Sequence, residues 1–493
     1  MPWPACSDCF RRWWSVVGTE PYPCGSPLAE GPGSLFGIST FGSGMVFVDH
    51  TSLRKPSRSA GQAPAPRLVR SPGPHRSLQK SGYRIGSEFP VASRGNFATT
   101  MRVLFLTHYG ELYGANRSML ELLLELRRGG EVLPHVVLPR EGELAAVLRE
   151  HAVPTAVIPF EPWMSERHYS GRWHHRLLQY WRHELQARKR ASANRRAQPE
   201  LRSKVREWGI QLLHANSSAV SVAHSLAGAS GLPLVWHVRE MPESHYHFHL
   251  DAGRRGYSRA LCGAHRIIAI SLAVRADVER YTGPSDRIAV IHNGVFREAR
   301  YPDPLAHPRS FSMRPFTFLM VGLVHPSKGQ LEAVEALSVL VAAGHDVRLV
   351  IAGGGRDRRL RERIVELGLQ DRVELMGYVE DPFPLYARAQ AYLMCSRNEG
   401  MGRVTVEAMA SGLPVIGHAS GGTPELIQDG VTGLFYTGDA SELADRMMQL
   451  VSDPAYARRL GDEAARTVPD RFSVERCALE VLDVYRSVLS AAK

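Results

Sequence analysis

Residues 391–427 read AYLMCSRNEGMGRVTVEAMASGLPVIGHASGGTPELI, and this stretch decides the fold class. It opens with an apolar run, Ala391 to Cys395, which is typical of a buried strand. A glycine-rich loop follows, then a short helix that stops at Gly412 and Pro414, and then a second apolar strand. Buried strands that alternate with short helices predict an α/β fold with a parallel sheet.

Two carboxylates lie close together in this stretch. Glu399 follows the first strand, and Glu407 is expected near the start of the helix. In an open α/β sheet, ligands bind at the carboxyl edge of the strands, where this loop must lie. Carboxylates at that edge can accept hydrogen bonds from sugar hydroxyls. Backbone amides near Gly400, Met401 and Gly402 can hold a phosphate group.

The spacing Glu399-x7-Glu407 resembles that of the family 4 glycosyltransferases of the GT-B fold. A surface carboxylate and a helix-terminal one favoured by the helix dipole are the alternative for a bare pair of glutamates. The neighbouring residues favour the family over that alternative, namely Gly400, Gly402, Met409, Gly412 and Pro414. The resemblance covers about residues 101–490. It implies two Rossmann-like doubly wound domains facing a cleft, a nucleotide-diphosphate sugar as donor substrate, and no cofactor.

Length and composition fit this class. A chain of 493 residues predicts two or three globular domains, and no apolar run approaches the roughly 18 residues of a membrane span. The six cysteines are too few and too scattered for a disulfide framework, which fits a reducing cytoplasm. The start of the sequence lacks the order of n-region, h-region and A-x-A site, so we expect a cytoplasmic protein without a secretory signal.

Residues 1–100 are rich in Pro, Gly, Ser and Arg and lack periodicity, so we predict that they are disordered or poorly ordered. Met101 then opens MRVLFLTHYG, which is typical of the first strand of an α/β domain. One hypothesis is that translation starts at Met101. The rival is an organelle transit peptide, and the acidic residues Asp8, Glu20 and Glu30 argue against it.

Two series of strand-like runs predict the domains. They indicate Rossmann-like domains over residues 101–300 and 316–493, joined by a linker at 301–315. The resemblance implies that the first is the acceptor domain and the second the nucleotide-sugar-binding domain. The expected strands are Val103–Thr107, His135–Leu138, Ala156–Phe160, Leu212–Ala215, Leu234–Val238, Ile267–Ile270 and Ile288–Ile291, then Phe318–Val321, Arg348–Ala352, Val373–Met376, Tyr392–Cys395, Val415–Gly417 and Leu434–Tyr436. A final helix, Val474–Ser490, is expected to pack back on the first domain, as the resemblance implies.

Much of the net charge of +11 lies in an insert at about residues 161–208. Its segment 167–206 carries about +10 by our count, and Trp163, Trp173 and Trp181 are interleaved with the arginines. A solvated charged helix and a helix on an anionic membrane surface both fit this pattern. Membrane docking would make the protein peripheral on the inner face of the membrane. We do not expect a nucleic-acid partner, because the basic segments lie outside the motif-bearing core.

Glycine-containing turns follow several of the expected strands. Gly114 opens a helix after the first strand, where it can meet an acceptor or a phosphate. Gly322 follows the first strand of the second series, and Gly353 and Gly377 follow its next two strands. The resemblance places the last two beside the nucleotide. A tight turn with no ligand is the alternative for each.

Lys328 is expected to neutralise the departing diphosphate from the entrance of a helix. The family often has an arginine directly after the glycine that Gly322 represents, but this chain has Leu323. We expect His325, Arg403 or backbone amides to supply the missing donor.

His237 lies near the end of a strand, where the family places a histidine that meets the donor sugar. A strand-end histidine bound to a neighbouring carbonyl is the alternative. Glu240 either orients His237 or binds the acceptor, and His214 is a weaker candidate.

The predicted catalytic residues are therefore His237, Lys328 and Glu399, and Glu407 is predicted to hold the ribose. No D-x-D pair stands beside a strand, so we expect no metal site. The resemblance implies a retaining hexosyltransferase that acts on a glycan or lipid-linked acceptor in polysaccharide or glycolipid biosynthesis. A nucleotide-sugar epimerase or hydrolase is the alternative, and a basic nucleic-acid-binding protein is a weaker one.

Overall fold

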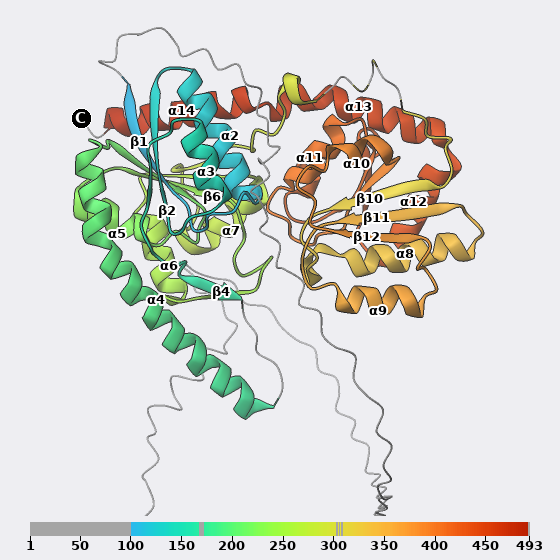
Figure 1. Cartoon of the computed structure of the whole chain (residues 1–493), viewed down its shortest axis with the longest axis horizontal. Helices are drawn as coiled ribbons and strands as arrows, with labels where there is room; N and C mark the ends of the chain where they lie inside the picture. The colour runs from blue at the N-terminus through green and yellow to red at the C-terminus, as the bar shows by residue number, and fades with distance from the viewer. Residues whose placement is uncertain (1–99, 167–171, 302–303, 305, 307–308, 492–493) are drawn as a thin grey trace, which may run out of the picture. The chain divides into compact units, whose positions relative to one another are not determined.

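The computed structural model describes residues 100–166, 172–301, 304, 306 and 309–491. Two parallel sheets organise these residues, one of seven strands and one of six (Figure 1). We call residues 101–301 the N-lobe and residues 309–473 the C-lobe. The two sheets confirm the predicted fold class of two Rossmann-like doubly wound domains. The predictions of disorder and of a start at Met101 concern residues 1–99, which lie outside the described residues.

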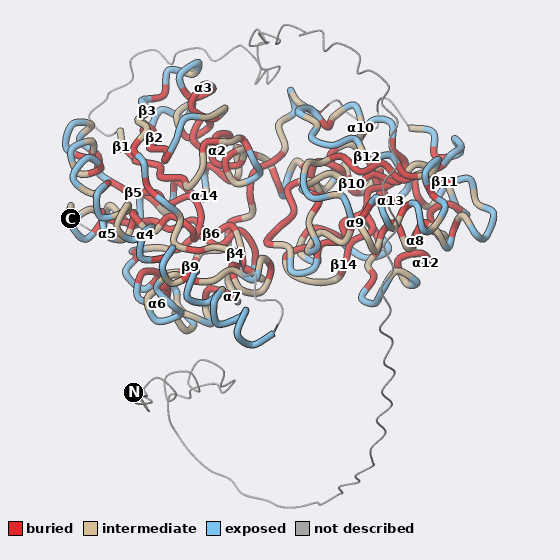
Figure 2. The backbone as a smooth tube through the Cα atoms, turned by 60° about the horizontal axis from the view of Figure 1, so that its bottom comes forward, coloured by how far each residue is buried: buried red, intermediate tan, exposed pale blue. Residues whose placement is uncertain are grey.

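The N-lobe sheet has the strand order β3-β2-β1-β5-β6-β8-β9. Its strands are β1 (Met101–Leu106), β2 (Val132–Leu138), β3 (Thr155–Val157), β5 (Leu212–Asn216), β6 (Leu234–Val238), β8 (Arg266–Ala269) and β9 (Ile288–Val290). Every residue of β5 and β6 is buried, which is typical of parallel strands covered by helices on both faces (Figure 2). The helices are α2 (Gly114–Arg128), α3 (Glu143–Glu150), α4 (Trp173–Glu207), α5 (Val222–Ser230), α6 (Gly253–Cys262) and α7 (Leu272–Thr282), and a 3₁₀ turn, η2, spans Glu298–Arg300.

The C-lobe sheet has the order β12-β11-β10-β13-β14-β15. Its strands are β10 (Phe316–Val321), β11 (Val347–Ala352), β12 (Val373–Gly377), β13 (Ala391–Met394), β14 (Val415–His418) and β15 (Gly433–Tyr436). The helices are α8 (Gln330–Ala342), α9 (Arg358–Glu366), α10 (Phe383–Arg388), α11 (Arg403–Ala410), α12 (Ala440–Ser452) and α13 (Pro454–Phe472), with 3₁₀ turns η3 (Pro326–Lys328) and η4 (Thr423–Glu425).

The strand order reverses beside the first strand of each sheet. In the C-lobe, β10 pairs with β11 on one side and with β13 on the other. The chain leaves these two neighbouring strands in opposite directions, so a crevice forms beyond their carboxyl ends. The loop after β10 carries Gly322 and Lys328, and the loop after β13 carries Glu399. The topology alone therefore brings Lys328 and Glu399 to one crevice.

The last helix, α14 (Val474–Ala491), packs on the N-lobe, as predicted. Its buried residues Cys477, Val481 and Tyr485 join an apolar cluster with β1 and α2. The Tyr485 hydroxyl also lies 2.7 Å from Nδ1 of His214 in β5. The final helix thus completes the hydrophobic core of the lobe that begins the chain.

The predicted insert contains one long helix. Strand β4 (Met164–Glu166) pairs with β7 (Phe248–Leu250) in a two-stranded antiparallel ribbon, and α4 follows after residues 167–171. Among the helices of the described residues, none is long and apolar enough to cross a membrane.

Candidate functional site

Lys328 and Glu399 meet at the crevice of the C-lobe sheet. The Lys328 Nζ lies 2.6 Å from Oε2 of Glu399, and the two side chains are 18% and 14% exposed. Both residues were predicted from the sequence, and the structure brings them together.

Each member of this pair keeps the other charged. Burial alone would raise the pKa of Glu399, but the Lys328 ammonium and the nearby His245 lower it to about 2. Burial alone would lower the pKa of Lys328, but the Glu399 carboxylate raises it above its usual value. The crevice therefore holds a full positive and a full negative charge at neutral pH.

A loop of the N-lobe that the sequence reasoning missed lies against this pair. Nε2 of His245 is 3.9 Å from Oε2 of Glu399, and the Tyr246 ring centroid is 5.8 Å from the Lys328 Nζ. Burial lowers the pKa of His245 to about 4, so its ring is neutral at pH 7. The run HYHFH over residues 245–249, soon after a cleft-edge strand, was the available signal.

Glu407 lies in the second turn of the short helix α11, a little further from the helix start than the sequence indicated. Its Oε1 accepts a hydrogen bond from Nε of Arg403 at 2.9 Å, and its Oε2 accepts one from the Tyr386 hydroxyl at 3.0 Å. The carboxylate is 2% exposed.

Arg403 does not replace the arginine that the family often has at the position of Leu323. Its two terminal nitrogens donate to the Glu121 carboxylate of α2 at 2.7 and 2.8 Å, and its Nε is held by Glu407. Two carboxylates therefore already balance this guanidinium. The other proposed donor, His325, lies with Nε2 3.0 Å from Oε1 of Glu166.

Three of the predicted glycines lie side by side at the carboxyl ends of β10, β11 and β12. The Gly353 N–H donates to the Gly377 carbonyl at 2.7 Å, and a Cβ on Gly353 would lie 1.8 Å from the Gly322 carbonyl oxygen. Gly322 and Gly377 have φ values of +146° and +70°, which strain other residues. Gly114 is exposed at the start of α2, with open space around it. Donor contacts by these glycines stay predictions.

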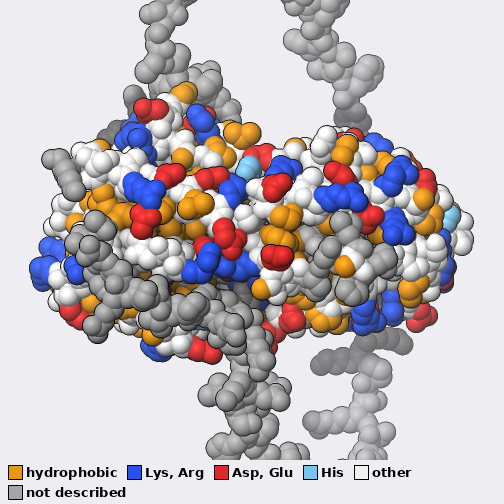
Figure 3. Space-filling model, turned by 90° about the horizontal axis from the view of Figure 1, so that it is seen from above, with side chains coloured by type: hydrophobic (Ala, Val, Ile, Leu, Met, Phe, Trp, Pro, Cys, Tyr) orange, Lys and Arg blue, Asp and Glu red, His pale blue; other side chains and the backbone are white. Residues whose placement is uncertain are grey.

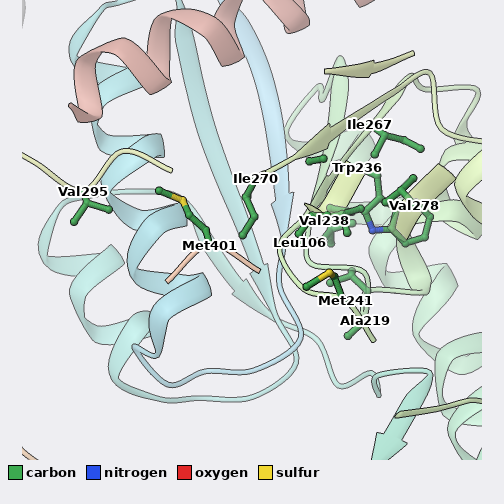
Figure 4. Packing of buried hydrophobic residues seen from close by; sticks show 14 of the residues in the cluster. Leu106, Ala219, Trp236, Val238, Met241, Ile267, Ile270, Val278, Val295 and Met401 are labelled. Atoms are coloured by element: carbon green, nitrogen blue, oxygen red, sulfur yellow. The ribbon is translucent and has the colours of Figure 1, made fainter. Parts of the chain in front are cut away.

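The loop after Glu399 packs between the lobes. A Cβ on Gly400 would lie 2.8 Å from the Arg239 carbonyl oxygen, and Gly402 has a φ of +86° before α11. Met401 is 1% exposed and packs with Val295 and Ile270 of the N-lobe (Figure 4). Met401 is therefore a packing residue in this structure. The predicted donor contact in this loop is through its backbone amides, and it stays a prediction.

His237 is the next-to-last residue of β6, whose bounds match the predicted strand. It is fully buried inside β6, its ring is 5.3 Å from that of His214, and its Nδ1 accepts a hydrogen bond from Arg239 at 3.3 Å. Burial lowers its pKa well below the usual value, so the ring is neutral. The His237 side chain is covered in this structure, so its predicted contact with the donor sugar requires local movement and stays a prediction.

Arg239 is the side chain that follows the strand, and sequence reasoning missed it. It is 7% exposed and donates to Oδ1 of Asn216 at 2.6 Å and to Oδ1 of Asn293. Burial lowers its pKa to about 10, so it remains charged. Within the part of the chain that the structure describes, no carboxylate forms an ion pair with it.

Glu240 does not orient His237. Its Oε1 accepts hydrogen bonds from the Ser217 hydroxyl at 2.5 Å, the Ser218 N–H at 2.8 Å and the Ser218 hydroxyl at 2.6 Å. No donor among the described residues reaches its Oε2. The fixed carboxylate thus keeps one oxygen available at the carboxyl edge of the N-lobe sheet.

Two family models match the chain on either side of this crevice. The model described as Glycosyltransferase Family 4 matches residues 113–298, and the model described as Glycosyl transferases group 1 matches residues 306–467. The chain belongs to the family 4, group 1 glycosyltransferases of the GT-B fold. This glycosyltransferase therefore carries the family's two-domain architecture around the Lys328–Glu399 pair.

Curated relatives agree with this membership. The N-acetyl-alpha-D-glucosaminyl L-malate synthase of Bacillus anthracis is 33% identical over 160 residues, which span 32% of this chain and 42% of that protein. The alpha-maltose-1-phosphate synthase of Mycobacterium tuberculosis is 30% identical over 262 residues, which span 46% and 65%. These alignments cover less than two thirds of each relative.

The HepE protein of Anabaena, solved with UDP and glucose, shares the fold of this glycosyltransferase. The TM-score is 0.62 at 23% identity, and the match covers 78% of this chain and 100% of that one. At this identity the likeness shows the fold.

The Lys328–Glu399 pair predicts a pH-dependent loss of stability. The folded pKa of Glu399 is about 2, below its usual 4.5, so its stabilisation is present above pH 4.5 and is lost as pH falls toward 2. We expect Glu399→Gln to lower the free energy of unfolding by about 3 kcal/mol at pH 7, and by progressively less below pH 4.5. Urea unfolding at pH 7, 5 and 3.5 measures this, with Glu362→Gln on the surface of α9 as the control. A difference that stays constant with pH would contradict the pairing.

Proposed function

We propose that this glycosyltransferase transfers a hexosyl group from a nucleoside diphosphate sugar to a glycan or lipid-linked acceptor. The proposal includes retention of the anomeric configuration, no requirement for a metal, and a place in polysaccharide or glycolipid biosynthesis. The observation that carries it is the Lys328–Glu399 ion pair at the strand-order reversal of the C-lobe sheet.

The pair suits the chemistry of a departing diphosphate. When the bond between the anomeric carbon and the diphosphate oxygen breaks, negative charge builds up on the leaving group. The Lys328 ammonium has three N–H groups, so it can bind a phosphate oxygen while it keeps its bond to Glu399. The free N–H groups at the start of α8, two residues later, add further donors. Glu399 then accepts hydrogen bonds from the hydroxyls of the sugar.

Glu407 is the proposed partner of the ribose. An ionised carboxylate has about four acceptor positions, so Arg403 and Tyr386 leave room for ribose hydroxyls. At 2% exposure the carboxylate is covered in this structure, so ribose binding requires local movement around α11.

Other support comes from the family and its members. The Anabaena structure holds UDP and glucose, which makes UDP-sugars the first donors to test. Retention is proposed from the family resemblance, and metal independence from the lack of a D-x-D pair beside a strand together with the charge of Lys328. The products in the names of the two relatives differ, so these names do not fix an acceptor for this chain.

We assign the acceptor side to Glu240. Its Oε1 is fixed by Ser217 and Ser218, so its Oε2 is held in one orientation. The buried ring of His108 lies near it: burial lowers the His108 pKa to about 4, although the Glu240 charge acts in the opposite direction. The Glu240 charge also acts on Tyr246, which lies over Lys328. A hydroxyl held by Oε2 would therefore stand on the N-lobe side of the donor site.

A ligand panel tests the proposed donor class. We expect one of UDP, GDP and ADP, with its sugars, to raise the melting temperature in the presence of EDTA, because a ligand that binds only the native state stabilises it. Consumption of the sugar nucleotide without any acceptor would instead favour a hydrolase or epimerase. No shift with any member of the panel would contradict the proposal.

Lys328→Ala should lower kcat by about 10²- to 10³-fold, because one donor to the developing charge is lost. The same change should leave the fold intact, as far-UV circular dichroism would show. Lys204→Ala, which removes a surface lysine paired with Glu207, is the matched control and should keep wild-type turnover. Unchanged kcat in Lys328→Ala would defeat the assigned role.

Glu240→Gln should raise the KM for the acceptor by at least about tenfold, since a charged hydrogen-bond acceptor becomes a neutral amide. The KM for the donor should change little, because Glu240 lies in the N-lobe. Steady-state kinetics with each substrate varied in turn separates the two. An equal change in both values would indicate a structural role for Glu240.

A further inference from the structure

The α4 helix contacts the N-lobe along only one side. His183, Ala187, Ala197, Leu201 and Val205 are its buried residues. Their steps of four residues, or of ten, which is nearly three full turns, place them in one stripe. Arg190 in the same stripe forms an ion pair with Asp251 at 2.5 Å, directly after β7. The helix is therefore fixed to the lobe, and its opposite side faces away from it (Figure 1).

That opposite side carries large apolar side chains in the first thirteen residues of the helix. Their exposed fractions run from 41% to 77%, and they are Trp173, Leu177, Leu178, Trp181 and Leu185. At 3.6 residues per turn they fall within an arc of roughly 140°, centred about opposite the buried stripe. The solvent-facing side of a surface helix normally carries polar and charged side chains, so five large apolar side chains on that side are unusual.

The same side becomes cationic in the following turns. Its exposed cations there are Arg188, Lys189, Arg195, Arg196 and Arg206. The whole helix contains ten Lys and Arg residues against three Glu residues. Elsewhere on the molecule, on the face seen in Figure 3, side chains of both signs are interspersed. We call Trp173, Leu177, Leu178, Trp181, Leu185 and these five cations the outer face of α4.

We propose that the outer face of α4 binds the surface of an anionic lipid bilayer. The apolar end enters the boundary between headgroups and acyl chains, and the cations lie over lipid phosphates. Nucleic acid fits less well, because the five apolar side chains form a continuous end that a phosphate backbone would leave uncovered. A solvated helix leaves the apolar end unexplained.

The attachment would place the crevice near the membrane. Strand β4 precedes α4 and pairs with β7, and β7 directly follows the loop that carries His245 and Tyr246. The Arg190–Asp251 pair joins α4 to the same segment. A lipid-linked acceptor, which rests on the proposed function, would therefore enter from the side that the bilayer covers.

Vesicle sedimentation with the full-length chain tests this surface without any sugar nucleotide. The probes are vesicles of phosphatidylcholine with a quarter phosphatidylglycerol and vesicles of phosphatidylcholine alone. We expect at least about tenfold tighter binding to the anionic vesicles, and weakening at 0.5 M salt. Equal binding to both vesicle types, or binding to neither, would overturn the proposal.

Two sets of substitutions separate the parts of the outer face. Trp173→Ser, Leu177→Ser, Leu178→Ser, Trp181→Ser and Leu185→Ser together should reduce binding at least about tenfold, and so should Arg188→Gln, Lys189→Gln, Arg195→Gln and Arg196→Gln together. Val365→Ser with Leu479→Ser, which removes two other exposed apolar side chains, is the matched control and should bind as wild type.

Other outcomes would identify a different partner for the outer face of α4 or support the bilayer independently. Light scattering that shows a dimer, lost in the serine variant and without vesicle binding, would assign the face to a second copy of the chain. Salt-dependent RNA binding that the serine variant retains would assign it to nucleic acid. Loss of vesicle binding with full turnover on a water-soluble acceptor would support the surface independently of the transfer chemistry.

Discussion

Lys328 and Glu399 each stay ionised because the other is ionised, and the charge of the crevice depends on both. Removing either ion from water is costly unless an opposite charge stands beside it. At 2.6 Å the two groups meet that condition, and both remain ionised in a largely buried place. The reversal of strand order between β10 and β13 makes the meeting possible, because it separates the two loops at their carboxyl ends. If neighbouring strands followed one another in the chain, the segment linking them would cross the carboxyl ends of the strands and cover the crevice.

The N-lobe also contacts the loops around this crevice, through a backbone carbonyl and through an ion pair. The Arg239 carbonyl packs against Gly400, which leaves no room for a side chain there. Arg403 joins α11 to α2 through Glu121, and it also holds Glu407, the proposed ribose partner. Breaking such a buried pair by removing one partner costs about 3–5 kcal/mol, so these contacts constrain the ligand site as well as the lobes. The proposed ribose binding by Glu407 would therefore be coupled to the Arg403–Glu121 ion pair between the lobes.

Much of the fold and part of the site followed from local patterns. Parallel strands buried on both faces are apolar runs, so each of the thirteen predicted strands overlaps a strand of the two sheets. Lys328 and Glu399 were predictable because each follows a strand whose place in the sheet the topology fixes. The bounds of β6 were predicted, but the complete burial of His237 depends on neighbours such as His214 and Arg239, which the local pattern does not contain. Met401, Arg403 and His245 depend on contacts between segments far apart in the chain, which no local pattern contains.

The course of α14 has a consequence for how the protein is made on the ribosome. This helix ends at Ala491, two residues before the end of the chain, yet it covers apolar side chains of β1 and α2. During synthesis the first half emerges long before its cover exists, and domains otherwise tend to fold in the order of translation. The apolar surface of the nascent N-lobe therefore stays exposed until α14 has been synthesised, and exposed apolar surface favours binding by chaperones. For the same reason, a truncation near the carboxyl terminus would destabilise the N-lobe.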